Sequence, residues 1–166
     1  ITNAQLAKLL FINDDNDTTA PDCTTKACGQ TCAHIHKLFP GLPDGNYMVA
    51  PTILSGIEFS VYCHNMASVP SDYLRLNAKA NFSTFATTSG RCAKCLDYTS
   101  YFSAVRIYPT TLVIDTSDRT FASQPTEFQK VCFIEFKCDA YLSYASAGSC
   151  GKGEADMTGT GNVDLT

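Results

Sequence analysis

Residues 44–66, DGNYMVAPTILSGIEFSVYCHNM, carry the clearest structural pattern in the chain. In the second half of this stretch, apolar and polar side chains alternate at every position, which is typical of a strand with one buried face. A short strand at residues 47–50 precedes it and begins from a turn in which Gly45 can adopt a positive φ. Residues 51–56 return the chain between the two strands, so we predict a β-hairpin. The side chains expected on its buried face are Ile57, Phe59, Val61 and Cys63, and those on its polar face are Glu58, Ser60, Tyr62 and His64.

Length and charge exclude several classes of protein. The 166 residues suit one domain with a hydrophobic core, and 45% of them are hydrophobic. The net charge is -4 and no basic block occurs, which argues against a nucleic-acid partner and against binding to anionic membranes. No apolar run reaches the roughly 18 residues that span a bilayer, so we expect no membrane insertion. The chain begins at Ile1 without a leader-like segment, as expected of a mature N-terminus.

The cysteines indicate the compartment. Nine cysteines, together with N-glycosylation sequons at Asn16 and Asn81, point to an oxidising, extracellular setting and a secreted glycoprotein. We expect structural disulfides, although spacing leaves their connectivity open, and we favour the pair Cys32–Cys63. Because nine is odd, one thiol is free, pairs with another chain or has lost its partner to processing. The cysteines are Cys23, Cys28, Cys32, Cys63, Cys92, Cys95, Cys132, Cys138 and Cys150.

Helices are expected only near the N-terminus. Leucines at helical spacing predict a short amphipathic helix in residues 1–12, and the acidic residues 13–22 predict an exposed linker. Residues 27–39 can form a second helix that stops before Pro40. The buried face of this second helix would carry Cys28, Cys32 and Ile35.

The rest of the chain has the pattern of short strands and turns. Residues 102–122 alternate and turn twice, as a β-meander does. We therefore predict a mainly β fold of disulfide-stabilised antiparallel sheets, sandwich-like or meandering, with one or two short helices near the N-terminus. The other candidates are strands at residues 68–76, 81–85 and 131–138 and a last hairpin around residues 159–161.

A series of motifs follows in order from Cys32 to the end of the chain. They are DGNYMV, IEFSVYCHNM, SDYLRL, the sequon NFS, KCLDY, FSAVRIY, TLVIDTSDRTFA, SYASAGSC and MTGTGNVDL. In this order they resemble the GON domain, the C-terminal module of some ADAMTS-type secreted metalloproteases. The resemblance implies an extracellular, non-catalytic, mainly β module that is stabilised by disulfides and acts in binding or localisation. Residues 1–31 have no counterpart in the family, so we divide the chain into an N-terminal helix and acidic linker (1–31) and a GON-like β domain (32–166).

Patterns that carry catalysis or metal binding are weak. The HExxH sequence of zinc proteases is absent, and the only histidines are His34, His36 and His64. On a helix, His34 and His36 face different directions. On an extended segment they could join His64 in a surface zinc or copper site, provided that Cys32 is bonded to Cys63. Ordinary exposed or packed histidines are the commoner interpretation.

Two further patterns have structural interpretations that outweigh the functional ones. Cys92-x-x-Cys95 could be a redox motif or half of a zinc site, but structural disulfides are more typical of a secreted chain. The acidic pairs Asp115 with Asp118 and Glu154 with Asp156 lie near turns, where acidic residues are common.

We therefore expect no enzymatic activity and no cofactor. The expected function is that of a secreted binding or adhesion module that acts through a protein or matrix surface, as a subunit of a larger assembly or with a disulfide-linked partner. The alternative is a carrier of a small molecule or a metal ion.

Overall fold

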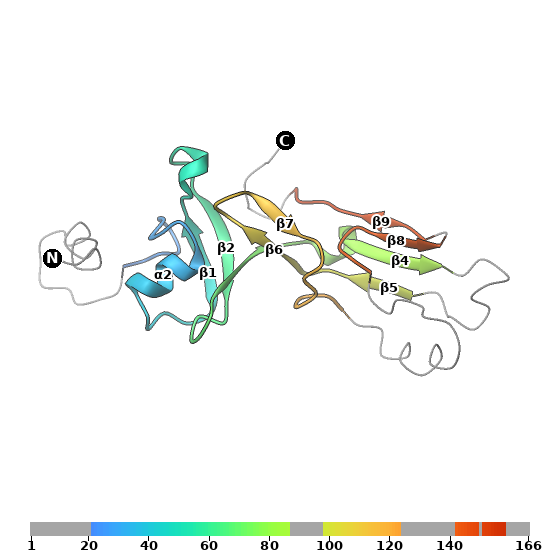
Figure 1. The fold of residues 1–166 in the computed structure, drawn as a ribbon, viewed down its shortest axis with the longest axis horizontal. Coiled ribbons are helices and arrows are strands. Elements are labelled where there is room, and N and C mark those ends of the chain that lie inside the picture. The colour runs from blue at the N-terminus through green and yellow to red at the C-terminus, as the bar shows by residue number, and fades with distance from the viewer. Residues whose placement is uncertain (1–20, 87–97, 124–141, 150, 159–166) are drawn as a thin grey trace, which may run out of the picture. The chain divides into compact units, whose positions relative to one another are not determined.

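The computed structural model describes residues 21–86, 98–123, 142–149 and 151–158 (Figure 1). The described chain is mainly β, with one short α-helix on its N-terminal side, and this confirms the predicted fold class. The helix predicted at residues 1–12, the strand at 131–138 and the hairpin around 159–161 lie outside the described residues. The elements are α2 (Cys32–Leu38), β1 (Gly45–Val49), η1 (Thr52–Leu54), β2 (Phe59–His64), β3 (Ser71–Arg75), η2 (Ala78–Ala80), β4 (Phe82–Ala86), β5 (Tyr98–Tyr101), β6 (Ala104–Tyr108), β7 (Val113–Asp115), β8 (Ala147–Ser149) and β9 (Gly153–Glu154).

The chain divides into two compact units. Of the described residues, the first unit holds 21–74 and 107–113, and the second holds 75–86, 98–106, 114–123, 142–149 and 151–158. One sheet contains β1, β2, β3, β6 and β7, and the other contains β4, β5 and β8, with β9 also paired to β4. The predicted division at residue 31 stays a prediction, because residues 1–20 are not described.

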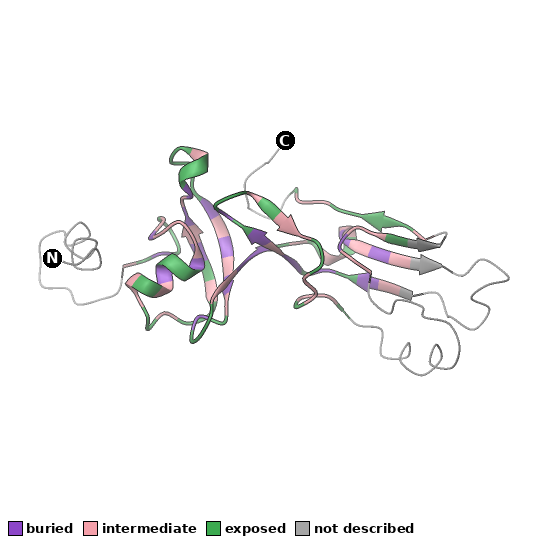
Figure 2. Cartoon of the chain, in the orientation of Figure 1, coloured by how far each residue is buried: buried purple, intermediate pink, exposed green. Residues whose placement is uncertain are grey.

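The predicted hairpin is confirmed. β1 pairs antiparallel with β2, and Gly45 lies opposite Cys63. Figure 2 shows the alternation of buried and partly exposed residues along β2, in which Phe59, Val61 and Cys63 are the buried ones. The buried face of a half-covered strand therefore follows directly from the two-residue period of its sequence.

Two details of the hairpin prediction were wrong. Ile57 is 55% exposed, because it lies in the connecting loop ahead of β2 rather than on the buried face. Gly45 is the first residue of β1 and does not have a positive φ. The left-handed residues lie instead in that loop, where Ser55 has a φ of 51° and Gly56 a φ of 94°.

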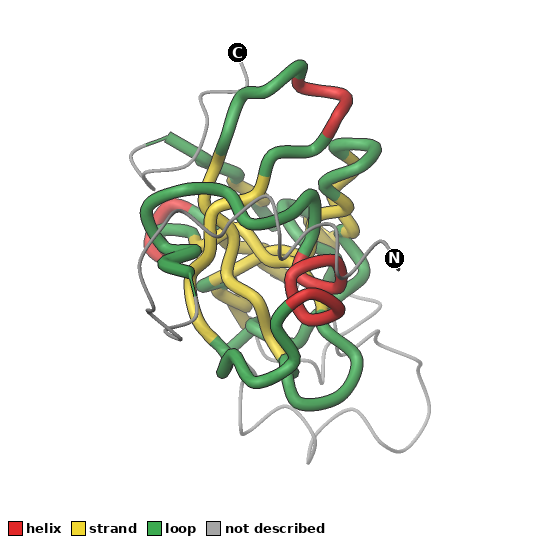
Figure 3. The backbone as a smooth tube through the Cα atoms, turned by 90° about the vertical axis from the view of Figure 1, so that its left-hand side faces the viewer, coloured by secondary structure: helices red, strands yellow, loops and turns green. Residues whose placement is uncertain are grey.

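The first α-helix of the described chain, α2, begins at a cap. The side chain of Thr31 accepts a hydrogen bond from the backbone N–H of His34 at 3.1 Å, which satisfies one of the open donors of the first turn. The buried residues of α2 are Cys32 and Ile35. Figure 3 shows α2 as a red coil beside the strands. The prediction that Cys28 shares this face was wrong, because Cys28 lies before the helix.

The segment before α2 runs beside β1. The N–H of Met48 donates to the carbonyl of Cys23 at 2.8 Å, and the N–H of Ala50 donates to the carbonyl of Gly29 at 2.9 Å. Gly29 and Val49 also form a parallel bridge. Residues 23–29 thus satisfy part of the outer edge of β1, which would otherwise present open hydrogen-bonding groups.

β6 and β7 confirm the predicted meander. Ala104, Val105 and Ile107 are buried, whereas Tyr108 is exposed, and a turn at Pro109 leads into β7. The pattern of residues 102–122 was therefore sufficient to place both strands.

β4 is the central strand of the second unit. It pairs antiparallel with β5, parallel with β8 and antiparallel with β9, where Ser83 lies opposite Gly153. At Gly153 the backbone approaches residue 145 so closely that a Cβ atom would overlap the carbonyl oxygen of Ala145. Only glycine fits at this point of β9.

We predict that Gly153→Ala lowers the free energy of unfolding by about 1–3 kcal/mol or more, because the added methyl group must displace backbone atoms. Urea unfolding of the variant beside wild type measures the change. Gly41→Ala is the control, since a Cβ atom at Gly41 meets nothing within 4 Å. Equal stability of G153A and wild type would contradict the close approach.

Candidate functional site

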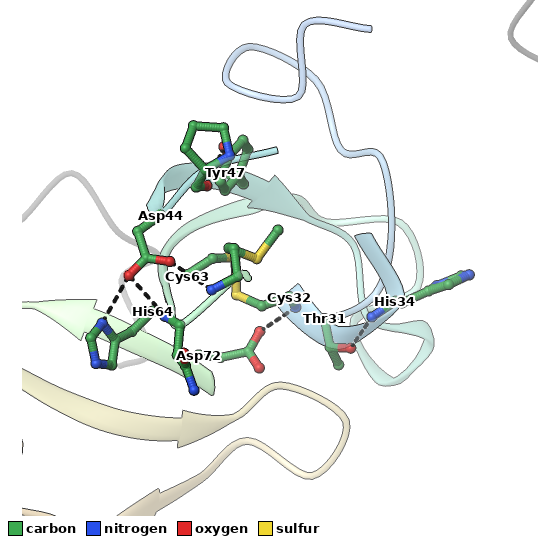
Figure 4. The surroundings of a disulfide bond; sticks show 11 residues. Thr31, Cys32, His34, Asp44, Tyr47, Cys63, His64 and Asp72 are labelled. Atoms are coloured by element: carbon green, nitrogen blue, oxygen red, sulfur yellow. Dashed lines mark hydrogen bonds and ion pairs between the residues drawn. A yellow bond between two sulfur atoms is a disulfide. The ribbon is translucent and has the colours of Figure 1, made fainter. Parts of the chain in front are cut away.

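A disulfide joins the helix of the first unit to its hairpin. Cys32 in α2 is bonded to Cys63 in β2, with 5.4 Å between their Cα atoms, and both residues are fully buried (Figure 4). This confirms the pair favoured from the sequence. A second disulfide, Cys23–Cys28, closes the turn that precedes α2.

Asp72 reinforces this link with a hydrogen bond. It lies opposite Cys63 in the pairing of β2 with β3 and is only 8% exposed. Its Oδ1 accepts a hydrogen bond from the backbone N–H of Cys32 at 2.7 Å, at the first turn of α2. A carboxylate is favourable there because the N–H groups at a helix N-terminus are unsatisfied and partly positive. The helix is therefore held by a covalent bond to β2 and a charged hydrogen bond from β3.

A second carboxylate, that of Asp44, closes the same open end of the hairpin, because Gly45 and Asp72 both lie opposite Cys63. Asp44 precedes β1, and its Oδ1 accepts from the N–H of Met66 at 2.6 Å. Its Oδ2 accepts from the N–H of Asn65 at 2.8 Å and lies 3.0 Å from Nδ1 of His64 (Figure 4). The backbone hydrogen bonds from Met66 and Asn65, in that order, lower the pKa of Asp44 below its ordinary value of 3.8, and His64 lowers it further.

The contact with Asp44 also orients the ring of His64. The ring stacks on Tyr62, with centroids 6.4 Å apart, and meets Tyr73 edge-on at 6.1 Å. The side chain is 40% exposed. An imidazole whose Nδ1 is held by a carboxylate has a defined orientation.

The metal site considered for His34, His36 and His64 does not form. The helical conformation of α2 turns His34 and His36 in different directions, and Figure 4 shows His34 and His64 on opposite sides of the disulfide. Nδ1 of His34 accepts from the N–H of Gln30 at 3.3 Å, whereas Nδ1 of His64 contacts Asp44. Across the described ranges, no three His, Cys, Asp or Glu residues are grouped so as to hold a metal ion.

The loop between β1 and β2 exposes apolar side chains. Residues 51–57, PTILSGI, contain no charged residue, and Ile53 and Ile57 are 54% and 55% exposed. Figure 1 shows η1 projecting beyond the ends of β1 and β2. Within the loop, the N–H groups of Leu54, Ser55 and Ile57 donate to carbonyls of the same loop at 3.0–3.1 Å. Three backbone donors of the loop are therefore satisfied within it, while its isoleucine side chains are exposed.

The structure places the asparagine of the predicted glycosylation site at Asn81 in the interior. Asn81 is fully buried, and its Nδ2, the atom that would carry a glycan, donates to the carbonyls of Asn77 and Asp156, each at 2.8 Å. Its Oδ1 accepts from the hydroxyl of Tyr144 and from the N–H of Asp156. In the folded unit the side chain has no room and no open donor for a sugar. The sequon at Asn16 lies outside the described residues.

Three of the four residues in the acidic pairs accept hydrogen bonds within turns, whereas Glu154 is exposed in β9. Asp115 accepts from the N–H and hydroxyl of Ser117, and Asp118 accepts from the N–H of Thr120. Asp156 accepts from the N–H and hydroxyl of Thr158, and these hydrogen bonds lower the pKa of its carboxyl group. Such hydrogen bonds are typical of turns. Cys92, Cys95, Cys132, Cys138 and Cys150 lie outside the described residues.

Comparison with models of protein families, with curated proteins and with solved structures found no match. A search of the described residues found no helix long and apolar enough to cross a membrane. The two disulfides fit an extracellular protein.

Sequence reasoning missed the roles of three polar residues. Asp44 was placed in a turn, Asp72 was not singled out, and Asn81 was expected at the surface. The available signal for Asp72 was an acidic side chain among the apolar residues of β3, because a buried carboxylate requires a partner. For Asp44 and Asn81 the partners that reveal their roles, Met66 and Asp156, lie more than 20 residues away, and no local pattern marks them.

We predict that Asp72→Ala lowers the free energy of unfolding by about 1–3 kcal/mol, because the N–H of Cys32 then lacks its partner in a buried environment. Urea unfolding with the disulfides intact measures the loss. Asp22→Ala is the control, since Asp22 is exposed and bonds only within its own turn, to Thr24 and Thr25. The same loss in both variants would contradict the role of Asp72.

We predict that Asp44 stabilises the protein only while it is ionised. Its folded-state pKa is below 3.8, so its contribution is fully present above the pKa of the unfolded chain and is lost as the pH falls through the folded pKa. Asp44→Asn should cost about 1 kcal/mol near neutral pH, a small value because the side chain is 36% exposed and screened by solvent. Unfolding curves at pH 7 down to pH 2 should converge for variant and wild type at the acid end. Curves that stay parallel would contradict the prediction.

Proposed function

We propose that this protein is an extracellular, non-catalytic binding module that contacts a protein of the extracellular matrix through the loop of residues 51–57. The observation that carries the proposal is the exposure of Ile53 and Ile57 on an uncharged loop. The resemblance of residues 32–166 to GON domains supports the same role.

The structure below the loop supports a binding role because it holds the loop in place. The loop joins β1 to β2, and just before it the N–H of Ala50 donates to the carbonyl of Gly29 at 2.9 Å. The carboxylate of Glu58, just after the loop, accepts from the N–H of Ala27 at 3.1 Å. A loop anchored on both sides loses little conformational entropy when it binds, so more of the contact energy becomes affinity.

The apolar side chains supply an amount of energy that would matter to a complex. Burying the exposed half of one isoleucine contributes about 1–1.5 kcal/mol. Two isoleucines in one loop would therefore contribute about 2–3 kcal/mol, which corresponds to a roughly 30- to 150-fold change in affinity. Replacing either isoleucine should cost the folded unit less stability than it costs a complex in affinity, because each side chain is more than half exposed in the free protein.

A covalent partner is compatible with this proposal. Four of the nine cysteines form the two described disulfides, which leaves five, Cys92, Cys95, Cys132, Cys138 and Cys150. Five cysteines cannot all pair among themselves, so at least one of them is reduced or bonded to a thiol outside these 166 residues. None of the five lies in residues 21–74 or 107–113, the described part of the first unit, so that part and its loop do not carry this link.

We predict that the double variant I53S/I57S loses binding to immobilised matrix proteins. Fibrillar collagen, laminin and fibronectin are tested by surface plasmon resonance, and wild-type protein should bind at least one of them. The variant should bind that protein roughly 30- to 150-fold more weakly, with unchanged thermal stability.

Val69→Ser is the matched control, because Val69 is 73% exposed in the turn between β2 and β3. It removes an apolar side chain of the same unit outside the loop and should leave the affinity unchanged. Binding to none of the three proteins, or equal weakening by V69S and I53S/I57S, would contradict the proposal.

A further inference from the structure

The sequon Asn81-Phe82-Ser83 is a glycosylation signal whose two essential side chains are both buried. Asn81 and Ser83 are each fully inaccessible, and Phe82 between them begins β4. Residues two apart in extended chain point to the same face, so the acceptor Asn and the hydroxyl of the sequon enter the interior together. The local sequence therefore predicts a glycosylation site at the surface, whereas the folded second unit buries Asn81 and Ser83.

The two side chains bind a segment that is distant in sequence. Oγ of Ser83 donates to the carbonyl of Ser143 at 2.6 Å and accepts from the N–H of Ser146 at 3.0 Å. Asn81 bonds both backbone groups of Asp156, through its Oδ1 at 2.9 Å and its Nδ2 at 2.8 Å. Residues 143–146 and residue 156 are therefore held on β4 by the same atoms that define the sequon.

Tyr144 closes this network. Its hydroxyl donates to Oδ1 of Asn81, and its ring packs edge-on against Phe102 with centroids 5.4 Å apart. Burial raises the pKa of Tyr144 to about 12, and the charge of Asp156 adds to this, so the hydroxyl remains a donor at physiological pH. All four hydrogen-bonding positions of the Asn81 amide are thus used: two donors and two acceptors.

Glycosylation and this network require the same nitrogen atom. Transfer forms a bond from Nδ2 to the anomeric carbon of an oligosaccharide, while the lipid diphosphate carrier leaves and Nδ2 gives up one proton. The modified amide retains one N–H and gains a bulky polar group, so one of its two hydrogen bonds is lost. A sugar cannot occupy a fully buried site without displacing the residues packed on it.

We propose that Asn81 is a fold-dependent acceptor: it can receive an N-glycan only before the second unit folds, and a glycan at Asn81 and the native second unit exclude one another. The proposal rests on the extracellular route given under the proposed function, since only a secreted chain meets the transferase. In that setting folding and glycosylation compete for one side chain, and the folded molecules carry an unmodified Asn81.

The test uses the full chain with a signal sequence, translated into microsomes that supply the transferase. Asn16→Gln is present throughout, so that every glycan counted lies in the second unit. Two variants are compared with wild type. Tyr144→Ala removes a hydrogen bond and the ring contact with Phe102 without altering the sequon, and should weaken the folded unit. Lys79→Thr is the matched control, because it completes a new sequon that begins at Asn77, an exposed asparagine four residues before Asn81.

Site occupancy is read by mass spectrometry after enzymatic removal of glycans, and folding is read by resistance to protease. We expect glycans at Asn77 of the K79T variant on protease-resistant molecules, and glycans at Asn81 only on protease-sensitive ones. Occupancy of Asn81 should rise several-fold in Y144A.

Protease-resistant protein with a glycan at Asn81 would overturn the proposal, as would an Asn81 that stays unmodified in Y144A while Asn77 of K79T is modified. Failure of the loop to bind a matrix protein would leave this result unchanged, because the microsomes supply the secretory route themselves.

Discussion

The covalent bond between Cys32 and Cys63 is the constraint on which the first unit depends. It closes a loop of 31 residues, and restricting the unfolded chain in this way is worth about 3–4 kcal/mol. The bond also fixes where α2 lies on the hairpin, and the hydrogen bond between the Asp72 carboxylate and the N–H of Cys32 then sets the start of that helix. A short helix of seven residues would be marginal by itself. It is stable here because both its buried face and its first turn are attached to strands.

The second unit depends on buried polar groups. Asn81 and Ser83 satisfy backbone groups of Ser143, Ser146 and Asp156, and the ring of Tyr144 packs against Phe102. A buried amide is costly unless every donor and acceptor is paired, and that condition is met at Asn81. Such a network holds the distant segment in one register, because a shift of one residue would leave several of these groups without partners.

These two forms of attachment have different consequences for function. In the first unit, the disulfide, Asp44 and Asp72 hold the open end of the hairpin, while hydrogen bonds of Glu58 and Ala50 hold the end that carries the apolar loop of residues 51–57. In the second unit, Asn81 and Ser83 of the glycosylation sequon are buried and take part in the polar contacts that hold the unit together. In both units the fold decides which side chains remain at the surface.

The sequence by itself predicted most local elements of the described chain and favoured the one long-range bond between Cys32 and Cys63. The period of residues 59–64 decided which face of β2 is buried, and the alternation in residues 105–108 did the same for β6, because neighbouring side chains of a strand point to opposite faces. Cys63 on a buried face, with Cys32 on a helix upstream, was enough to suggest their pairing. Only the tertiary structure decided the roles of Asp44, Asp72 and Asn81, and the position of Cys28 outside the helix. Those outcomes depend on partners up to 75 residues away, and a carboxylate or amide looks the same in sequence whether it meets solvent or a buried backbone N–H.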